Sequence, residues 1–221
     1  MRRIEPQQRI ELRRIYARKL LNVISSQGFH SLKIQEMARI MNVSKATLYN
    51  YFSSKEDIIQ EVANHYLDYI QEIDQMVLND DLSFTYRFQK LFQQGVLSTI
   101  YASEAFLNDL KASFPQQYEE MMVARKKRLE SIKTFYKKGM DEGIFHSLNA
   151  SLIIMQDEVT FRRLVDPNFL TEEGLSIQQA LYDYYKVKKV QLLQPNVLSK
   201  VNDEPIHEMI AYIIRKLSNT Y

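Results

Sequence analysis

The fold of this protein is decided by residues 31–59, which read SLKIQEMARIMNVSKATLYNYFSSKEDII. In the first part of this stretch, apolar residues recur every three or four positions, at Ile34, Met37, Ala38 and Met41. Such spacing places them on one face and predicts a short amphipathic helix over residues 34–41. A second short helix is expected to start at Ser44, so two short helices follow each other closely.

The link between these helices has the composition of a tight turn. Asn42 stands where a left-handed residue is needed, and Asn is the commonest substitute for Gly in that conformation. Val43 can fill the gap between the helices, and Ser44 is a favourable N-cap that starts the second helix abruptly. The pattern predicts a helix-turn-helix unit, whose second helix enters the major groove with its N-terminal residues toward the base edges.

The second helix carries side chains suited to this task, with Leu48 as its expected buried member. Lys45 supplies charge for a phosphate or a guanine, and Asn50 can read adenine. Ala46 and Thr47 carry methyl groups that can meet the methyl group of thymine.

Three further residues near the end of this stretch can contact phosphates. Tyr49 and Tyr51 have hydroxyl groups that can donate to phosphate oxygens, and Lys55 lies in the first turn of the next helix beside free N–H groups. Other interpretations stay open, because Tyr49, Tyr51 and Phe52 can instead be core aromatics, and lysines are common on solvated helix faces.

These motifs resemble the TetR/AcrR family of bacterial transcriptional regulators. The resemblance covers about residues 10–60 and rests on Gly28-Phe29, Ile34 to Ala38, Val43 to Phe52 and Lys55 to Ile59. It implies a three-helix DNA-binding domain over residues 1–54 and a helical regulatory and dimerisation domain over 55–221, with 55–78 as connecting helix. The residues expected to contact DNA are Lys33, Gln35, Ser44, Lys45, Ala46, Thr47, Tyr49, Asn50, Tyr51 and Lys55.

The chain departs from the family pattern at three points. Family members often have Thr or Ser where this chain has Leu32-Lys33, so either Lys33 replaces a phosphate contact or Ser31 caps the helix. Asn42 stands where the family usually has Gly. Ala46 also replaces a common Gly, which leaves the base-edge contacts less predictable.

Composition agrees with an all-α fold. The 221 residues include only five Gly and five Pro, too few for a sandwich or barrel that turns every 8–12 residues or so. Residues 1–60 hold 11 Lys/Arg and 5 Asp/Glu, whereas the remainder holds 18 Lys/Arg and 22 Asp/Glu. A basic N-terminal part on an acidic body indicates a polyanionic partner at one end.

Apolar spacing is helical along the rest of the chain. A first helix carries apolar residues from Leu12 to Ile24 and ends at Gly28. Further helices are expected at 54–78, 84–101, 103–113, 116–142, 149–165, 176–193 and 204–218. Pro115, Gly143, Pro167, Gly174, Pro195 and Pro205 mark their edges.

The resemblance implies a small-molecule effector bound in the helical body. Candidate lining residues are aromatic and Met side chains, although core packing is the commoner role for each: Phe88, Phe92, Tyr101, Phe106, Met121, Met122, Met155 and Phe161. Gly95 and Gly139 lie inside helical patterns and indicate close helix approach or a kink beside a cavity. The last two helices are expected to form a homodimer interface, with 149–165 contributing.

Enzyme, metal and membrane functions have little support. Four scattered histidines form no metal-binding pair, and the chain has no cysteine, P-loop or nucleophile elbow. No cofactor is implied, and neither a signal peptide nor a membrane-spanning run is present, so we expect a cytoplasmic protein. The favoured hypothesis is a homodimeric repressor of a palindromic DNA operator, relieved by a small molecule. The alternative is a helical ligand-binding or interaction protein that does not bind DNA.

Overall fold

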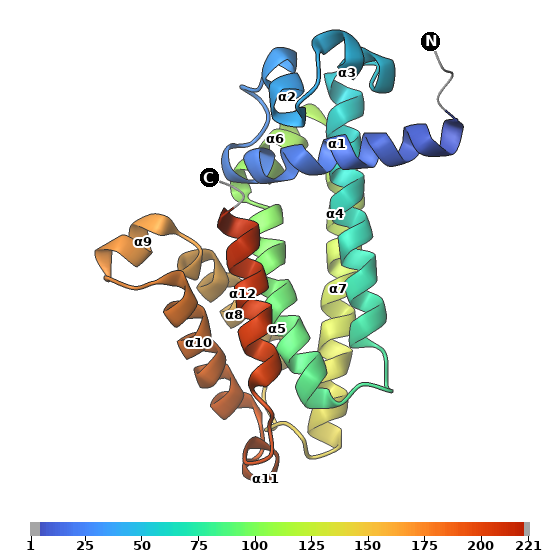
Figure 1. Cartoon of the computed structure of the whole chain (residues 1–221). Helices are drawn as coiled ribbons and strands as arrows, with labels where there is room; N and C mark the ends of the chain where they lie inside the picture. The colour runs from blue at the N-terminus through green and yellow to red at the C-terminus, as the bar shows by residue number, and fades with distance from the viewer. Residues whose placement is uncertain (1–4, 219–221) are drawn as a thin grey trace. The chain divides into compact units, whose positions relative to one another are not determined.

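The computed structural model describes residues 5–218, and these are arranged almost entirely in α-helices (Figure 1). Between Phe145 and Leu193 there is one isolated antiparallel bridge, and no strand occurs in the described range. The predicted all-α fold is therefore confirmed. The helices are α1 (Pro6–Gln27), α2 (Ile34–Met41), α3 (Lys45–Tyr51), α4 (Lys55–Val77), α5 (Phe84–Tyr101), α6 (Glu104–Ser113), α7 (Pro115–Asp141), α8 (Ala150–Leu164), α9 (Pro167–Glu172), α10 (Ile177–Leu192), α11 (Pro195–Leu198) and α12 (Glu204–Ser218).

Every helix whose bounds were predicted begins and ends within two residues of its predicted position. Two short helices were not predicted. α9 and α11 begin at Pro167 and Pro195, which were expected only as boundaries. Proline is favoured at the first helical position because its missing N–H has no partner there, so it begins short helices as well as ending longer ones.

The chain divides into two compact units that do not follow the order of the sequence. Unit 1 comprises the described residues up to Ile70 together with Tyr101–Ala124, and unit 2 comprises Gln71–Ile100 together with the chain from Arg125 onward. α6 and the first part of α7, expected in the regulatory domain, thus belong to the same unit as the helix-turn-helix.

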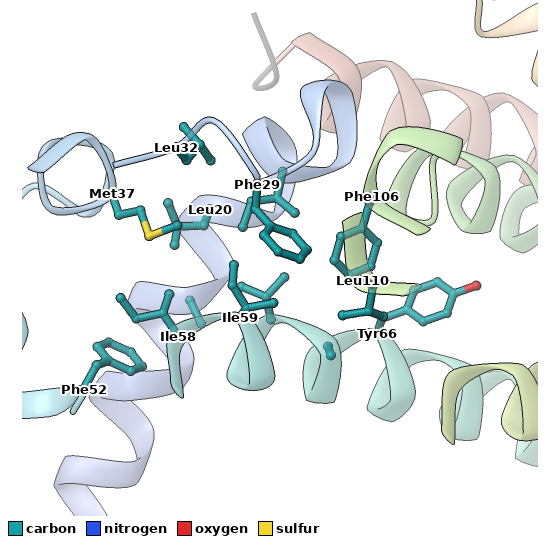
Figure 2. Close-up of a cluster of buried hydrophobic side chains, with 14 of the residues drawn as sticks. Leu20, Phe29, Leu32, Met37, Phe52, Ile58, Ile59, Tyr66, Phe106 and Leu110 are labelled. Atoms are coloured by element: carbon teal, nitrogen blue, oxygen red, sulfur yellow. The ribbon is translucent and has the colours of Figure 1, made fainter. Parts of the chain in front are cut away.

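The core of unit 1 is built from α1 to α4 together with α6 (Figure 2). Leu20 of α1 and Met37 of α2 are fully buried in it, as are Leu48 of α3 and Phe52, which directly follows α3, so each of the first three helices contributes an anchor. Phe29 lies beside Phe106 of α6, with 6.1 Å between ring centroids in an edge-to-face arrangement. Each buried side chain of this size contributes about 1.5–3 kcal/mol relative to full exposure, so α6 is part of the hydrophobic core.

Unit 2 has an aromatic core in which two glycines allow close packing. A Cβ atom at Gly95 would lie 2.5 Å from the ring of Phe161, and one at Gly139 would lie 2.2 Å from the ring of Phe145. Close helix approach is confirmed at Gly95, since Phe161 belongs to α8, whereas the ring beside Gly139 belongs to Phe145 in the segment that follows α7. Phe92 packs edge-to-face on Phe161 with centroids 5.2 Å apart.

The described residues contain neither a helix suited to span a membrane nor a cluster suited to hold a metal ion. No helix among them combines the length and apolar character needed to cross a membrane. The same residues contain no group of three or more His, Cys, Asp or Glu side chains placed to hold a metal ion.

Candidate DNA-binding interface

The turn between α2 and α3 has the backbone conformation that the sequence predicts. Asn42 adopts φ 60° and ψ 48°, and it is the one non-glycine residue with positive φ among those described. The next N–H, from Val43, donates to the carbonyl of Ala38 at 2.9 Å and closes the end of α2. The left-handed turn residue is confirmed, and it brings α3 across α2 after only three linking residues.

Ser44 caps α3, as expected. Its Oγ accepts from the backbone N–H of Thr47 at 3.0 Å and lies 2.8 Å from the Thr47 hydroxyl. Both hydroxyl groups are therefore engaged with each other at the first turn. This cap defines the start of α3 and holds the orientation of its N-terminal residues.

One side of α3 is exposed, and it carries most of the residues predicted to contact DNA. Lys45, Ala46, Tyr49 and Asn50 are exposed, whereas Leu48 on the opposite side is buried. The Lys45 ammonium lies 5.9 Å from the centroid of the Tyr49 ring, a cation–π distance that holds the two side chains together. The exposed set combines one positive charge, two hydrogen-bonding groups and a methyl group.

A shallow groove between α2 and α3 extends this face. It is lined by Gln35, Ala38, Arg39, Asn42, Val43, Ser44 and Lys45. Arg39 was not among the predicted contacts, although it is exposed and adds a second positive charge to the groove. Its sequence signal was available, because Arg39 follows the exposed Gln35 by one helical turn.

Three of the residues predicted to contact DNA interact with other residues of the protein. Lys33 occupies the N-cap of α2, where its backbone N–H donates to Glu36 at 2.8 Å, so the cap is at Lys33 and not at Ser31. Lys55 donates to the carbonyl of His30 at 3.2 Å. Tyr51 is buried with its ring 5.1 Å from that of Tyr16, a position that favours its interpretation as a core aromatic.

Arg13 of α1 holds the end of α3 in place. Its Nη1 donates to the carbonyl of Tyr51 at 2.6 Å, and its Nη2 to Asp57 Oδ1 at 2.5 Å. The guanidinium lies 4.7 Å from the centroid of the Phe52 ring. These contacts, made from a third helix, stabilise the orientation of α3 relative to α1 and α4.

The carboxylate of Asp57 is the acceptor at the centre of this network. Hydrogen bonds from Arg13, and from the N–H and hydroxyl of Ser53, lower the pKa of Asp57 from 3.8 to about 2. A pKa that is lower in the folded than in the unfolded state stabilises the fold fully above about pH 4, and this contribution is lost as the pH falls from about 4 toward 2.

Asp57→Asn is therefore expected to lower the free energy of unfolding at pH 7 by about 1–2 kcal/mol, after allowance for solvent screening of this partly exposed group. Between pH 4 and pH 2 the difference from the wild type should shrink toward zero. Urea unfolding at a series of pH values measures both effects. Asp68→Asn is the matched control, since Asp68 pairs with Arg14 at 3.3 Å on the surface and should contribute below about 0.5 kcal/mol. Equal losses for the two variants would contradict this role of Asp57.

A second carboxylate positions the loop before α2. Asp109 of α6 accepts from the backbone N–H of Phe29 at 2.6 Å and from that of His30 at 2.7 Å. Gly28 precedes this pair with φ 75° and ψ −169°, a conformation that is essentially restricted to glycine. Sequence reasoning missed Asp109, because 80 residues separate it from Phe29 and no local pattern marks it.

The residues predicted to line an effector site do not gather at one place. Phe88, Phe92 and Phe161 are buried in the aromatic core of unit 2. Met155 of α8 is exposed at the surface. The others belong to unit 1, where they pack in or against its core cluster: Tyr101, Phe106, Met121 and Met122.

A short, capped helix exposed beside a tight turn, on a three-helix support, defines a DNA-binding protein of the helix-turn-helix class. Residues 19–62 match the family model described as bacterial regulatory proteins, tetR family. Residues 19–62 therefore form a TetR-type DNA-binding domain, and the described part of the chain has the fold of solved transcriptional regulators. No curated protein matches the sequence.

Several solved structures share this fold. The ketosteroid transcriptional regulator KstR2 of Mycobacterium tuberculosis is 18% identical, with a TM-score of 0.59 over 87% of this chain and 100% of that one. AibR in complex with isovaleryl coenzyme A and operator DNA is 14% identical, with a TM-score of 0.58 over 80% and 97%. A TetR/AcrR regulator from Thermobifida fusca is 17% identical, with a TM-score of 0.53 over 82% and 96%.

Proposed function

We propose that the chain is a homodimeric repressor that binds a palindromic DNA operator in the cytoplasm and is released by a small-molecule effector. The observation that carries the proposal is the exposed side of α3, with Lys45, Tyr49 and Asn50 beside a capped N-terminus. A helix so short and so exposed fits the major groove of B-DNA, which admits one α-helix. The opposing hypothesis is a helical ligand-binding protein that does not bind DNA.

An exposed apolar face supports the homodimer. Side chains on α8 and α10 that are between 54% and 64% exposed form an apolar stripe: Leu152, Met155, Val159, Val187 and Val190. Their spacing of three, four and three residues keeps them on one side of each helix. The two helices lie side by side, since Tyr184 donates to Asp157 at 2.8 Å and Gln191 donates to Gln156 at 3.1 Å.

A second copy of the chain is the partner that fits this stripe. Two-helix faces of this kind pair about a two-fold axis into a four-helix interface, in which each stripe covers the other. The sequence led us to expect α10 and α12 in this role, with α8 contributing. However, α12 directs its apolar residues Ile206, Ile210 and Ile213 into the core of unit 2, so the proposal places the interface on α8 and α10.

The proposed dimer sets the geometry of the operator. Two-fold symmetry gives two copies of α3 that read equivalent half-sites. The centres of these half-sites lie about 34–36 Å apart if they are separated by one turn of DNA, and farther apart if the separation is larger. An effector changes DNA affinity only through its different affinities for the two states of the protein. α4 and α7 each continue from unit 1 into unit 2, so each offers a helical connection for this effect. The AibR structure with both an acyl coenzyme A and operator DNA supports this combination of ligands in the family.

DNA binding is tested on the region upstream of the chain's own gene. Lys45→Ala is expected to weaken binding to every sequence and to reduce the salt slope by about one unit, because one phosphate contact is lost. Asn50→Ala is expected to cost about 1–3 kcal/mol on the operator and to relax its sequence preference, with the salt slope unchanged. Fluorescence anisotropy with several DNA sequences and salt concentrations measures the affinity, the sequence preference and the salt slope.

Lys137→Ala serves as the control, since Lys137 is an exposed lysine of α7 in unit 2. It removes the same charge from the chain without touching the proposed interface, and binding should stay at the wild-type level. A wild-type protein with no salt-sensitive DNA binding would favour the opposing hypothesis instead.

A further inference from the structure

Arg128 of α7 is a buried cation for which the described residues supply no counter-charge. Its side chain is 6% exposed, and its Nε has no hydrogen-bond partner among the described residues. The other buried cations of unit 2 each have a carboxylate nearby. Arg87 lies 3.0 Å from Asp80, and Lys188 lies 3.1 Å from Asp157.

Glu158, which follows Asp157 on α8, does not form an ion pair with Arg128. Glu158 is paired with Arg125, one turn earlier on α7, with Nη2 at 2.7 Å from its Oε1. A buried guanidinium without an opposite charge is strongly unfavourable, because it loses hydration and gains no ion pair in return. Among the described residues no carboxylate pairs with Arg128, so an anion is the chemical group that suits this position.

The register of α5 and α7 predicts that Gln94 faces Arg128. The start of α5 meets the end of α7, where the Arg87 guanidinium lies 5.4 Å from the centroid of the Phe135 ring. Gln94 follows Arg87 by seven residues, and Arg128 precedes Phe135 by seven. In antiparallel helices, a step of two turns along one and two turns back along the other leads to the next facing pair.

Gln94 has an unused polar group as well. Its Oε1 is buried and has no hydrogen-bond partner among the described residues. By this register, Arg128 and Gln94 would offer a positive charge and an amide oxygen, each without a partner among the described residues, in the same interior. Buried polar groups of native proteins are nearly always hydrogen-bonded, so this pair is a candidate place for a bound ligand.

The neighbouring wall of this interior is apolar. Gly95 follows Gln94 directly, and the Phe161 ring occupies the space beside it, with Phe92 packed edge-to-face on that ring. A ligand that reaches both Arg128 and this wall needs an anionic head and an apolar body.

We propose that unit 2 binds an amphipathic organic anion, whose carboxylate accepts hydrogen bonds from Arg128 beside Gln94 and whose apolar body packs against Phe161 and Phe92. The assignment of this anion as the effector rests on the proposed function, whereas its binding does not. The charge of Arg128 makes the site select a carboxylate over a neutral compound of the same shape.

The test compares octanoate with octanamide, which share a hydrocarbon chain and differ in charge. Isothermal titration calorimetry of the full chain is expected to give octanoate an affinity about tenfold or more above that of octanamide, since a charge-assisted hydrogen bond to a buried guanidinium is lost with the amide. Arg128→Met should bind both compounds equally, and Arg125→Met should keep the preference because Arg125 already has Glu158 as partner. Arg128→Gln provides a second neutral variant, with hydrogen-bond donors but no charge.

Thermal unfolding of the same variants separates a ligand site from a structural role. Without an added anion, Arg128→Met is expected to unfold about 2–4 °C higher than the wild type, because an unpaired buried charge is replaced by an apolar side chain. The proposal is overturned if the wild type binds neither compound, if it binds both equally, or if Arg128→Met or Arg128→Gln keeps the preference for octanoate. DNA binding by Arg128→Met should match the wild type in the absence of octanoate. Absence of DNA binding by the wild-type protein would contradict the proposed regulatory function but not the proposed anion site.

Discussion

Val159→Glu is expected to convert the proposed dimer into monomers at micromolar concentration. Val159 lies on the exposed stripe of α8, and an interface about a two-fold axis contains every substituted residue twice. Each dimer would then bury two carboxylates without partners, at a cost of several kcal/mol. Sedimentation velocity measures the change directly.

The loss of the dimer has a second consequence for DNA binding. Two linked copies of α3 bind a palindrome as one bivalent ligand, and bivalency raises overall affinity by about 10²–10⁴-fold over that of a single copy. Val159→Glu should therefore weaken operator binding by about this factor while each α3 stays folded. Val123→Glu is the matched control, because Val123 of α7 is similarly exposed but lies outside the stripe. A dimeric Val159→Glu variant, or a monomeric Val123→Glu variant, would show that the interface lies elsewhere.

Gly28→Ala is expected to lower the free energy of unfolding by about 3–5 kcal/mol, the sum of backbone strain and lost charge-assisted hydrogen bonds. The added Cβ would lie 2.3 Å from Asp109 Oδ2, so Asp109 must move away from the N–H groups of Phe29 and His30. DNA binding should fall as well, because these bonds hold the loop that leads into α2.

Gly174→Ala separates the two causes of this loss. Gly174 also has positive φ, at 61°, but a Cβ there would meet nothing within 4 Å. Its substitution should cost only the left-handed backbone strain, about 1–2 kcal/mol. Urea unfolding of both variants gives the comparison, and similar losses at Gly28 and Gly174 would argue against the contribution of Asp109.

The parts of the fold that sequence reasoning predicted depend on neighbours in the chain. Asn42 adopts its left-handed conformation because of local backbone sterics. Ser44 caps α3 because its side chain accepts a hydrogen bond from Thr47, three positions on. In the longer helices, the apolar spacing likewise indicates which face of each helix is buried. For this reason the helix-turn-helix and the exposed side of α3 were predictable from a single sequence.

The parts that were missed depend on residues far apart in the chain. Asp109 and Arg13 support the helix-turn-helix from other helices, and no local pattern distinguishes them from surface charges. The apolar pattern of α12 predicted burial correctly, but such a pattern does not show whether the same chain or a second copy covers the helix. Arg128 was not singled out, because an isolated arginine on a helix is normally exposed.

The composition of unit 1 has a consequence for how the protein is made. Its core is complete only when Phe106, Leu110 and Met121 lie against α1 and α4, so a fragment that ends at residue 54 or 70 leaves apolar surface uncovered. On the ribosome, the DNA-binding helices therefore emerge well before the residues that complete their core. We therefore expect the native packing of these helices to be completed only after residue 124 has been synthesised, with the nascent chain exposed to chaperones and proteases until then.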